Sequence, residues 1–177
     1  MSIDWHEFNT LEAELLESFQ NLTREPWLDE VMTLYTGLDD AGKLAIVTCV
    51  ALLILRKDKR IGACASVALV LETLLVNLIF KPLVRRPRPY IINEAIDVLV
   101  HMPEDYAFPS GHTGSCFAVA GVMLLCLPKK YGIPAFLLAV LMGFSRMYVG
   151  VHYFTDVLGG AGIGMGCAVI AKKLFKR

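Results

Sequence analysis

Three short segments of the sequence carry side chains that could bind and cleave a phosphate. They are Lys81 with Arg88-Pro89, Pro109-Ser110-Gly111-His112, and Ser145-Arg146 with His152 and Asp156. Together they supply three cations, two imidazoles and a carboxylate, and each segment borders a strongly apolar stretch. Such a set could hold a phosphate at a membrane surface and cleave it without a metal ion.

The three cations suit the charged oxygens of a phosphate ester. Arginine binds two oxygens through its planar fork and keeps its charge. The prolines on either side of Arg88 would hold it in an extended, non-helical segment. Arg146 ends an apolar stretch, where simple headgroup binding is the weaker explanation. For Arg85 and Arg86 headgroup binding is favoured, with contact to a second phosphate as the alternative.

The two histidines suggest a division of labour. His152 and Asp156 are four residues apart, so they would share one face of a helix that begins there. A carboxylate that accepts a hydrogen bond from one imidazole nitrogen leaves the other free to attack phosphorus. His112 would then protonate the departing oxygen. Ser110 is the expected N-cap of the next helix, and the free N–H groups of Gly111 and His112 would face a bound anion.

The composition favours a membrane protein. The chain has 177 residues, 55% of them hydrophobic, and a mean hydropathy of +0.54. Its formal net charge is +0, and nothing in the sequence suggests a nucleic-acid partner. The five cysteines lie in apolar stretches without the spacing of metal ligands. We therefore expect no metal site and no cofactor.

Five apolar stretches predict membrane-spanning helices. They cover residues 42–55, 61–80, 113–127, 133–148 and 157–170. Several are shorter than the ~20 residues that cross a bilayer, so a soluble helical core is the alternative. Basic clusters follow the first, third and fifth stretches, and the positive-inside rule places all three in the cytoplasm. Residues 81–112 then lie outside. Glu72, within the second stretch, is a candidate functional residue, although a structural hydrogen bond is favoured.

Two helices at the ends of the chain have informative patterns. Residues 5–22 place apolar side chains at helical spacing with acids between them. This predicts an amphipathic helix on the membrane or, equally, a surface helix packed on its own protein. The last stretch contains Gly160-xxx-Gly164 and Gly162-xxx-Gly166, whose small residues let helices approach closely. Packing inside the bundle is favoured over a dimer interface.

The three segments resemble the signature of the type 2 phosphatidic acid phosphatase family, whose site is similar to that of vanadium-dependent haloperoxidases. The match spans residues 81–156, and every motif position is present. The resemblance implies an all-α integral membrane bundle with a core similar to the haloperoxidases. We count five transmembrane helices plus the N-terminal amphipathic helix, whereas such enzymes are often described with six. The expected division is an interfacial segment at residues 1–40 and a membrane-embedded phosphatase domain at residues 41–177.

The resemblance also implies roles for individual residues. His152 would be the nucleophile that forms a phosphohistidine, with Asp156 as its orienting partner. His112 would be the acid for the leaving group. The residues that would bind the phosphate are Lys81, Arg88, Ser110, Gly111 and Arg146.

The predicted function is a metal-independent lipid phosphatase, multi-pass in the cell inner (plasma) membrane, with its site on the extracytoplasmic side. Undecaprenyl diphosphate is the first choice of substrate, because the chain is compact and Arg85 and Arg86 could meet a second phosphate. Phosphatidylglycerol phosphate and phosphatidic acid are the alternatives. A transporter or channel with a basic vestibule has no need for two histidines with Asp156, and a haloperoxidase has no reason for five apolar stretches. The sequence does not set the oligomeric state.

Overall fold

The computed structural model describes residues 5–55 and 58–175. All the regular secondary structure in these residues is helical. The elements are α1 (Trp5–Thr23), α2 (Pro26–Gly37), the 3-10 turn η1 (Asp40–Gly42), α3 (Lys43–Leu55), α4 (Lys59–Leu74), the π-helix η2 (Leu75–Phe80), α5 (Lys81–Val84), α6 (Pro89–Ile92), α7 (Gly111–Cys126), α8 (Lys129–Tyr148) and α9 (Phe154–Leu174). Helices cover all five predicted stretches. The all-α prediction is confirmed.

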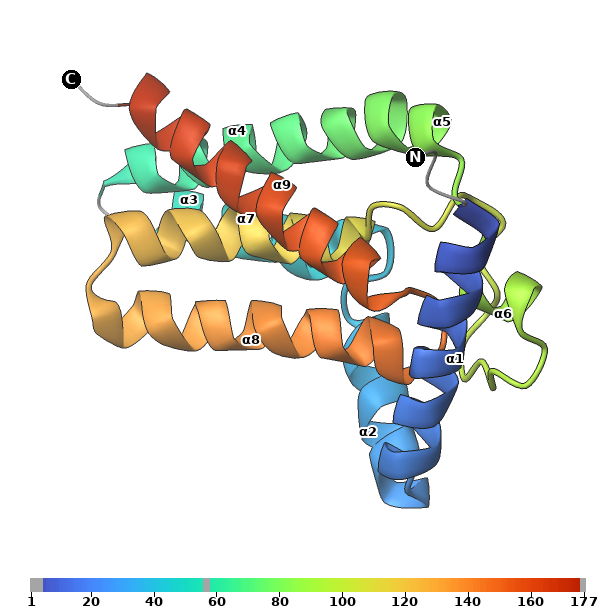
Figure 1. Ribbon diagram of the computed structural model, residues 1–177. Helices are drawn as coiled ribbons and strands as arrows, with labels where there is room; N and C mark the ends of the chain where they lie inside the picture. Colours follow the sequence, from blue (N-terminus) through green and yellow to red (C-terminus); the bar gives the residue numbers. More distant parts are fainter. Residues whose placement is uncertain (1–4, 56–57, 176–177) are drawn as a thin grey trace.

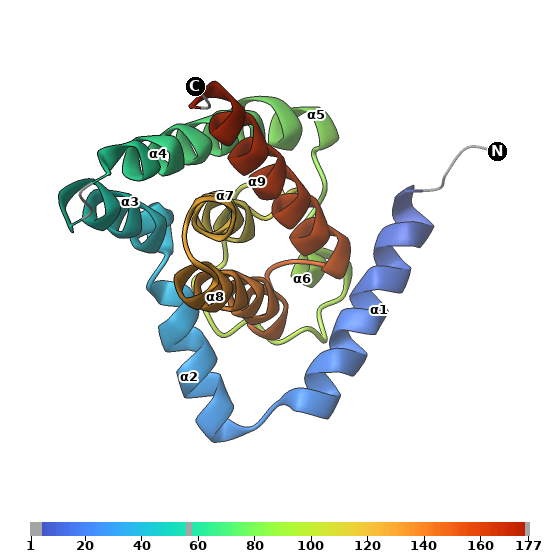
Figure 2. The ribbon, with the colours of Figure 1, turned by 90° about the vertical axis from the view of Figure 1, so that its left-hand side faces the viewer.

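Helix α7 is the centre of the bundle. Figure 2 looks nearly along its axis and shows α3, α4, α8 and α9 arranged around it. Every residue from Thr113 to Val122 is buried. The 16 residues of α7 rise only ~24 Å, less than the ~30 Å of a hydrocarbon core. A helix surrounded by protein tolerates this shortfall, because its ends do not meet lipid.

The outer faces of the surrounding helices are apolar. Exposed large hydrophobic side chains include Val47 on α3, Leu78 on η2, Leu137 on α8 and Leu158 on α9. Among the described residues, three segments are long and apolar enough to cross a membrane, namely Lys59–Ile92, Lys129–Tyr148 and Phe154–Leu174. Apolar surface on this scale needs lipid around it. The protein is a membrane protein, and the number of spans stays a prediction.

The basic clusters share one end of the bundle. In Figure 1 the end of α3, the start of α4, the α7–α8 connection and the end of α9 lie together at the left, opposite α1, α5 and α6. Lys59 begins α4, Lys129 begins α8, and Lys172 lies in the last turn of α9. Residues 56, 57, 176 and 177 of the predicted clusters lie outside the described residues. This geometry agrees with the expectation that the clusters face one side of the membrane.

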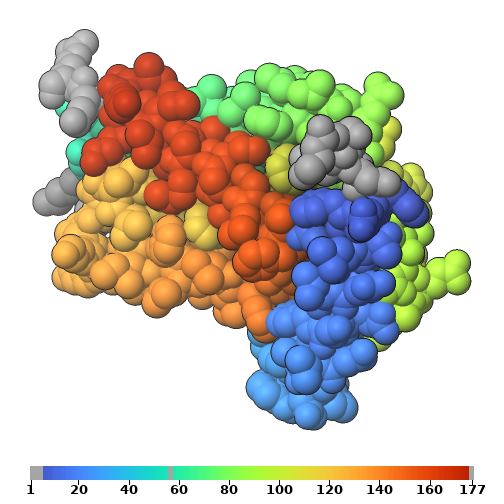
Figure 3. All heavy atoms as spheres, viewed as in Figure 1, coloured from blue at the N-terminus to red at the C-terminus, as the bar shows by residue number. Residues whose placement is uncertain are grey.

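Helix α1 lies against the opposite end of the bundle, beside the start of α9 (Figure 3). Its buried face carries Asn9, Glu12, Ala13, Leu16 and Gln20. Leu11, Leu15 and Leu22 form an exposed stripe on the other face. The helix therefore packs on its own protein through a partly polar face and presents leucines outward. Contact of this stripe with lipid stays a prediction, as does the division at residue 40.

Glycines bring α9 against α7. A Cβ at Gly160 would lie 2.4 Å from the carbonyl oxygen of Ser110, and a Cβ at Gly164 would lie 2.4 Å from that of Gly114. A Cβ at Gly162 would meet nothing within 4 Å. The first glycine motif thus packs inside the bundle, as predicted, whereas the second lies on an open face of α9.

We expect Gly164→Ala to destabilise the protein by about 1–3 kcal/mol, because the new methyl group collides with backbone that cannot move independently. Gly162→Ala is the matched control and should be neutral or slightly stabilising, since alanine is the better helix former. Thermal unfolding in detergent compares them. Equal melting temperatures for the two variants would contradict the packing described.

Candidate active site

Six of the eight predicted site residues line one cavity of about 420 Å³ at the end of the bundle near α5 and α6. They are Lys81, Arg88, Gly111, His112, Arg146 and His152. Of the remaining two, Asp156 lies directly behind His152, and Ser110 caps α7. The structure therefore brings the three sequence segments together at a single place.

Helix ends deliver these residues to the cavity. The π-helix η2 stops directly before Lys81, and turns of this kind are frequent at functional sites. Ser110 is the N-cap of α7, as predicted, and its hydroxyl accepts a 3.4 Å hydrogen bond from the Thr113 N–H. The Ser110 N–H donates to the Asp156 carbonyl at 3.0 Å. This bond joins the second sequence segment to the third.

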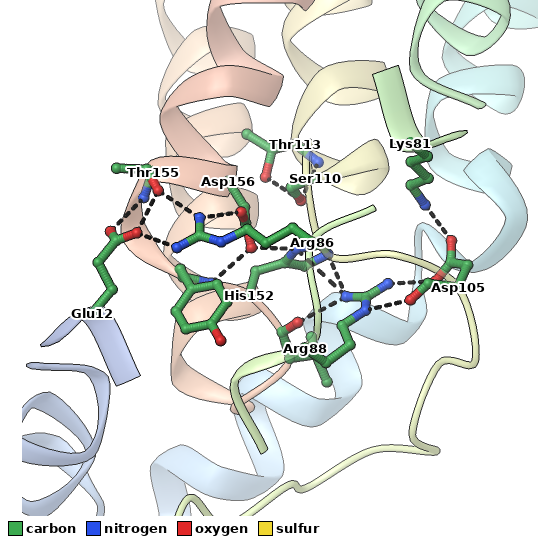
Figure 4. Close-up of polar contacts among 12 residues, drawn as sticks. Glu12, Lys81, Arg86, Arg88, Asp105, Ser110, Thr113, His152, Thr155 and Asp156 are labelled. Atoms are coloured by element: carbon green, nitrogen blue, oxygen red, sulfur yellow. Dashed lines mark hydrogen bonds and ion pairs between the residues drawn. The ribbon is translucent and has the colours of Figure 1, made fainter. Parts of the chain in front are cut away.

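His152 lies between an arginine and a carboxylate (Figure 4). An Arg88 Nη1–H donates to His152 Nε2 at 2.9 Å. Because an arginine can only donate, the imidazole proton lies on Nδ1, which is 3.4 Å from Asp156 Oδ2. The ring is 2% exposed. This burial, together with the charges of Arg88, Arg146 and Lys81, lowers the pKa of His152 well below its ordinary value.

Asp105 lies between Lys81 and Arg88. Its carboxylate forms ion pairs with Lys81 and, at 2.5 Å, with Arg88 Nη2. Burial alone would raise the pKa of Asp105, but the hydrogen bond and charge of Lys81, joined by Arg88, lower it. The side chain is half exposed on the loop before α7. An anion that bound both cations through the same donors would have to displace this carboxylate.

Arg146 has an unused donor. Its guanidinium is buried, and Nη1 donates to the Thr36 hydroxyl of α2 at 2.6 Å. Its Nε–H has no hydrogen-bond partner among the described residues. A buried charged donor of this kind is costly unless something binds it, so Arg146 is well placed to hold an oxygen of a ligand in the cavity.

Acidic residues line the cavity wall near His112. His112 Nε2 lies 3.5 Å from Asp40 Oδ1. Asp39 accepts hydrogen bonds from Ser115 Oγ and from a backbone N–H, but burial raises its pKa. Glu72 is buried on the same wall, with Oε1 unpaired within the described chain. Residues 5–55 and 58–175 contain no group of three His, Cys, Asp or Glu side chains that could hold a metal ion.

The expectation for Arg86 was wrong. Its guanidinium is 5% exposed and is bound by Asp156 and Glu12, so it is free for neither a headgroup nor a second phosphate. Arg85 is exposed, as expected. Sequence reasoning also missed Asp105 and Thr36, which stand outside the motifs and show no spacing signal.

The profile of the PAP2 superfamily matches residues 61–177. The chain belongs to the PAP2 superfamily. Phosphatidylglycerophosphatase B of Bacillus subtilis is 35% identical to it over 157 residues, which are 81% of this chain and 73% of that protein. An undecaprenyl-diphosphatase of Sulfolobus acidocaldarius is 34% identical to it over 109 residues, which are 62% of this chain and 52% of that protein.

A solved PAP2 relative also shares the fold. The crystal structure of Aquifex aeolicus LpxE matches with a TM-score of 0.80 and 34% identity, covering 90% of this chain and 93% of that one. The family inferred from the three motifs, the helical membrane fold and the lipid phosphatase class of enzyme are confirmed. The PAP2 profile begins at residue 61, so α1 and α2, which bring Glu12 and Thr36 to the site, precede the matched part.

We expect Asp105→Asn to tighten the binding of inorganic phosphate about three- to tenfold, because loss of the carboxylate frees Lys81 and Arg88. Glu104→Gln removes an exposed acid next to Asp105 and is the matched control. Titration calorimetry on the detergent-solubilised protein measures both. Weaker phosphate binding in Asp105→Asn would show that Asp105 holds the cations in place rather than competing with the anion.

Proposed function

We propose that this protein is a metal-independent phosphatase that removes phosphate from a membrane lipid phosphate or diphosphate through a phosphohistidine. One observation carries the proposal: two imidazoles and three cations line the same cavity, and a buried carboxylate lies behind one of the imidazoles. Such an arrangement can neutralise, orient and attack a phosphoryl group.

In the first chemical step, the phosphoryl group binds Lys81, Arg88 and Arg146 in place of Asp105. Arg88 moves the Nη1–H that it donates to His152 Nε2 onto a phosphoryl oxygen, and the freed Nε2 forms a bond to phosphorus as the bond from phosphorus to the lipid oxygen breaks. Burial and the charge of Arg146 lower the pKa of His112 to about 4, so His112 takes up a proton as the negatively charged phosphoryl group binds and then gives that proton to the departing oxygen. The His152 Nδ1–H stays on the ring, and the carboxylate of Asp156 offsets the positive charge that the imidazole gains.

In the second step, water attacks the phosphohistidine. His112, now neutral, takes a proton from this water, and the N–P bond breaks to release inorganic phosphate and restore His152. The lowered pKa of His152 keeps the ring neutral before attack, which is the form that a nucleophile requires.

Undecaprenyl diphosphate stays our first choice of substrate, and the relative from Sulfolobus acidocaldarius carries that activity in its name. Because Glu12 and Asp156 bind Arg86, contact with a second phosphate would come from Arg85 alone. It lines a second hollow that also contains Arg88 and Asp105, so it lies next to the cavity and could meet a second phosphate. Phosphatidylglycerol phosphate and phosphatidic acid remain the alternatives, the first in keeping with the Bacillus relative.

The bundle geometry supports a location for the reaction. The cavity lies at the end opposite the basic clusters. With those clusters in the cytoplasm, the site opens on the extracytoplasmic side of the inner (plasma) membrane. A lipid substrate would reach it from the outer leaflet.

Phosphate release from lipid phosphates in excess EDTA tests the mechanism. We expect turnover by the wild type and none by His152→Ala, which should form no phosphoenzyme. His112→Ala should lose turnover of lipids but still form phosphoenzyme from an aryl phosphate, whose leaving group needs no proton. Normal activity of His152→Ala would exclude it as the nucleophile. No wild-type turnover on any lipid would favour the transporter or channel alternative.

A comparison of kcat/KM on undecaprenyl diphosphate, phosphatidylglycerol phosphate and phosphatidic acid in one detergent tests the substrate. We expect Arg85→Ala to lower kcat/KM about tenfold for the diphosphate, in the range for one charge-assisted contact, and to spare phosphatidic acid. Lys130→Ala, a base at the opposite end of the bundle, is the control. An equal loss on all three lipids would contradict a second phosphate site at Arg85.

A further inference from the structure

A buried polar cluster lies directly behind His152, on the side away from the cavity. We call it the Arg86 cluster, and its members are Asn9, Glu12, Arg86, Thr155 and Asp156. Helix α1 supplies the first two, the segment between α5 and α6 supplies Arg86, and the first turn of α9 supplies the last two (Figure 4). Three separate parts of the chain therefore meet behind one imidazole.

Arg86 is fixed on every side. Its Nη1 donates to Asp156 Oδ1 and to Thr155 Oγ1, both at 2.7 Å, and its Nη2 donates to Glu12 Oε2 at 2.5 Å. Its Nε donates to Asn9 Oδ1 at 2.9 Å. The guanidinium also stacks on Tyr153, 3.8 Å from the ring centroid. The fork therefore has little freedom to rotate.

Arg86 and the α9 backbone together fix the orientation of the Asp156 carboxylate. Oδ1 accepts from Arg86, while Oδ2 accepts from the Tyr153 N–H at 3.0 Å and faces His152 Nδ1. Loss of the Arg86 contact would let the carboxylate turn about its own bond. Glu12 secures the other end of the fork, since its two oxygens also accept from the N–H and the hydroxyl of Thr155.

The charges of the cluster also favour catalysis. Asp156 and Arg86 alone would neutralise each other, which would leave little field to stabilise a positive ring. Glu12 adds a second carboxylate, so the cluster carries one net negative charge. In a buried site this charge acts at low dielectric. A buried ion pair adds little to stability on its own, so a second buried acid calls for another explanation.

We propose that Glu12 and Arg86 are positioning residues for the reaction, which hold Asp156 against His152 and keep a net negative charge behind the imidazole when phosphorus binds to it. The proposal rests on the proposed function. It also gives the N-terminal helix, which precedes the residues matched by the family profile, a part in the chemistry of the site.

Steady-state kinetics of Glu12→Gln on a lipid phosphate test the proposal. Glutamine keeps the shape and the hydrogen-bonding oxygen but removes the charge. We expect kcat to fall about ten- to a hundredfold, the range for residues that orient a functional histidine through a second contact. The KM and the inhibition constant of inorganic phosphate should change less than about threefold, because Glu12 contacts none of the cavity cations.

Two further variants separate positioning from folding. Glu14→Gln makes the same substitution at an exposed position of α1 and should keep wild-type kcat. Glu12→Asp keeps the charge and should recover much of the kcat that Glu12→Gln loses. If Glu12→Gln does not fold, Asn9→Ala, which removes only the contact to Arg86 Nε, takes its place with a smaller loss of kcat.

The results separate a failure of the positioning role from a failure of the proposed phosphatase function. An inactive wild type on every lipid phosphate in EDTA would overturn the proposed function. An active wild type with unchanged kcat in Glu12→Gln, or in Asn9→Ala where that variant takes its place, would overturn the inference alone. So would equal losses in Glu12→Gln and Glu12→Asp with matching losses of melting temperature, since these would show a structural role only.

Discussion

The burial of His152 among positive charges is the interaction on which the rest of the site depends. Burial beside Arg88 disfavours a second proton on this imidazole, and its pKa falls accordingly. Its single N–H then needs a buried acceptor, which Asp156 provides. That carboxylate is itself fully buried and needs a partner, which is Arg86. Each residue in this series creates the requirement that the next one meets.

The bundle supplies the precision that this series requires. The site is assembled at helix ends, where free N–H groups and a change of chain direction are both available. Close packing of α9 on α7 through Gly160 allows the Ser110 N–H to reach the Asp156 carbonyl. The backbone of the turn at Ser110 is thereby joined to the backbone at Asp156. Helix α1, which lies beside the bundle, completes the Arg86 cluster with Asn9 and Glu12.

Much of this arrangement could be predicted from the sequence, and there are physical reasons why the rest could not. Apolar stretches and cap residues are local signals, so the helices and the N-cap at Ser110 were predictable. Arg85 and Arg86 are chemically identical neighbours, yet Arg85, with its left-handed φ of 52°, is exposed and Arg86 is buried. Asp105 lies in a loop without periodicity. Glu12 resembled a surface acid, although it shares a helical face with the buried Leu16, four residues on.

The most direct test of the account is a structure of the protein bound to vanadate, which forms a five-coordinate analogue of phosphorus under attack. We expect vanadium bonded to His152 Nε2, its oxygens on Lys81, Arg88 and Arg146, and Asp105 displaced from between the cations. Vanadate held by these cations but bonded to another residue, or bound while Asp105 keeps both ion pairs, would contradict it.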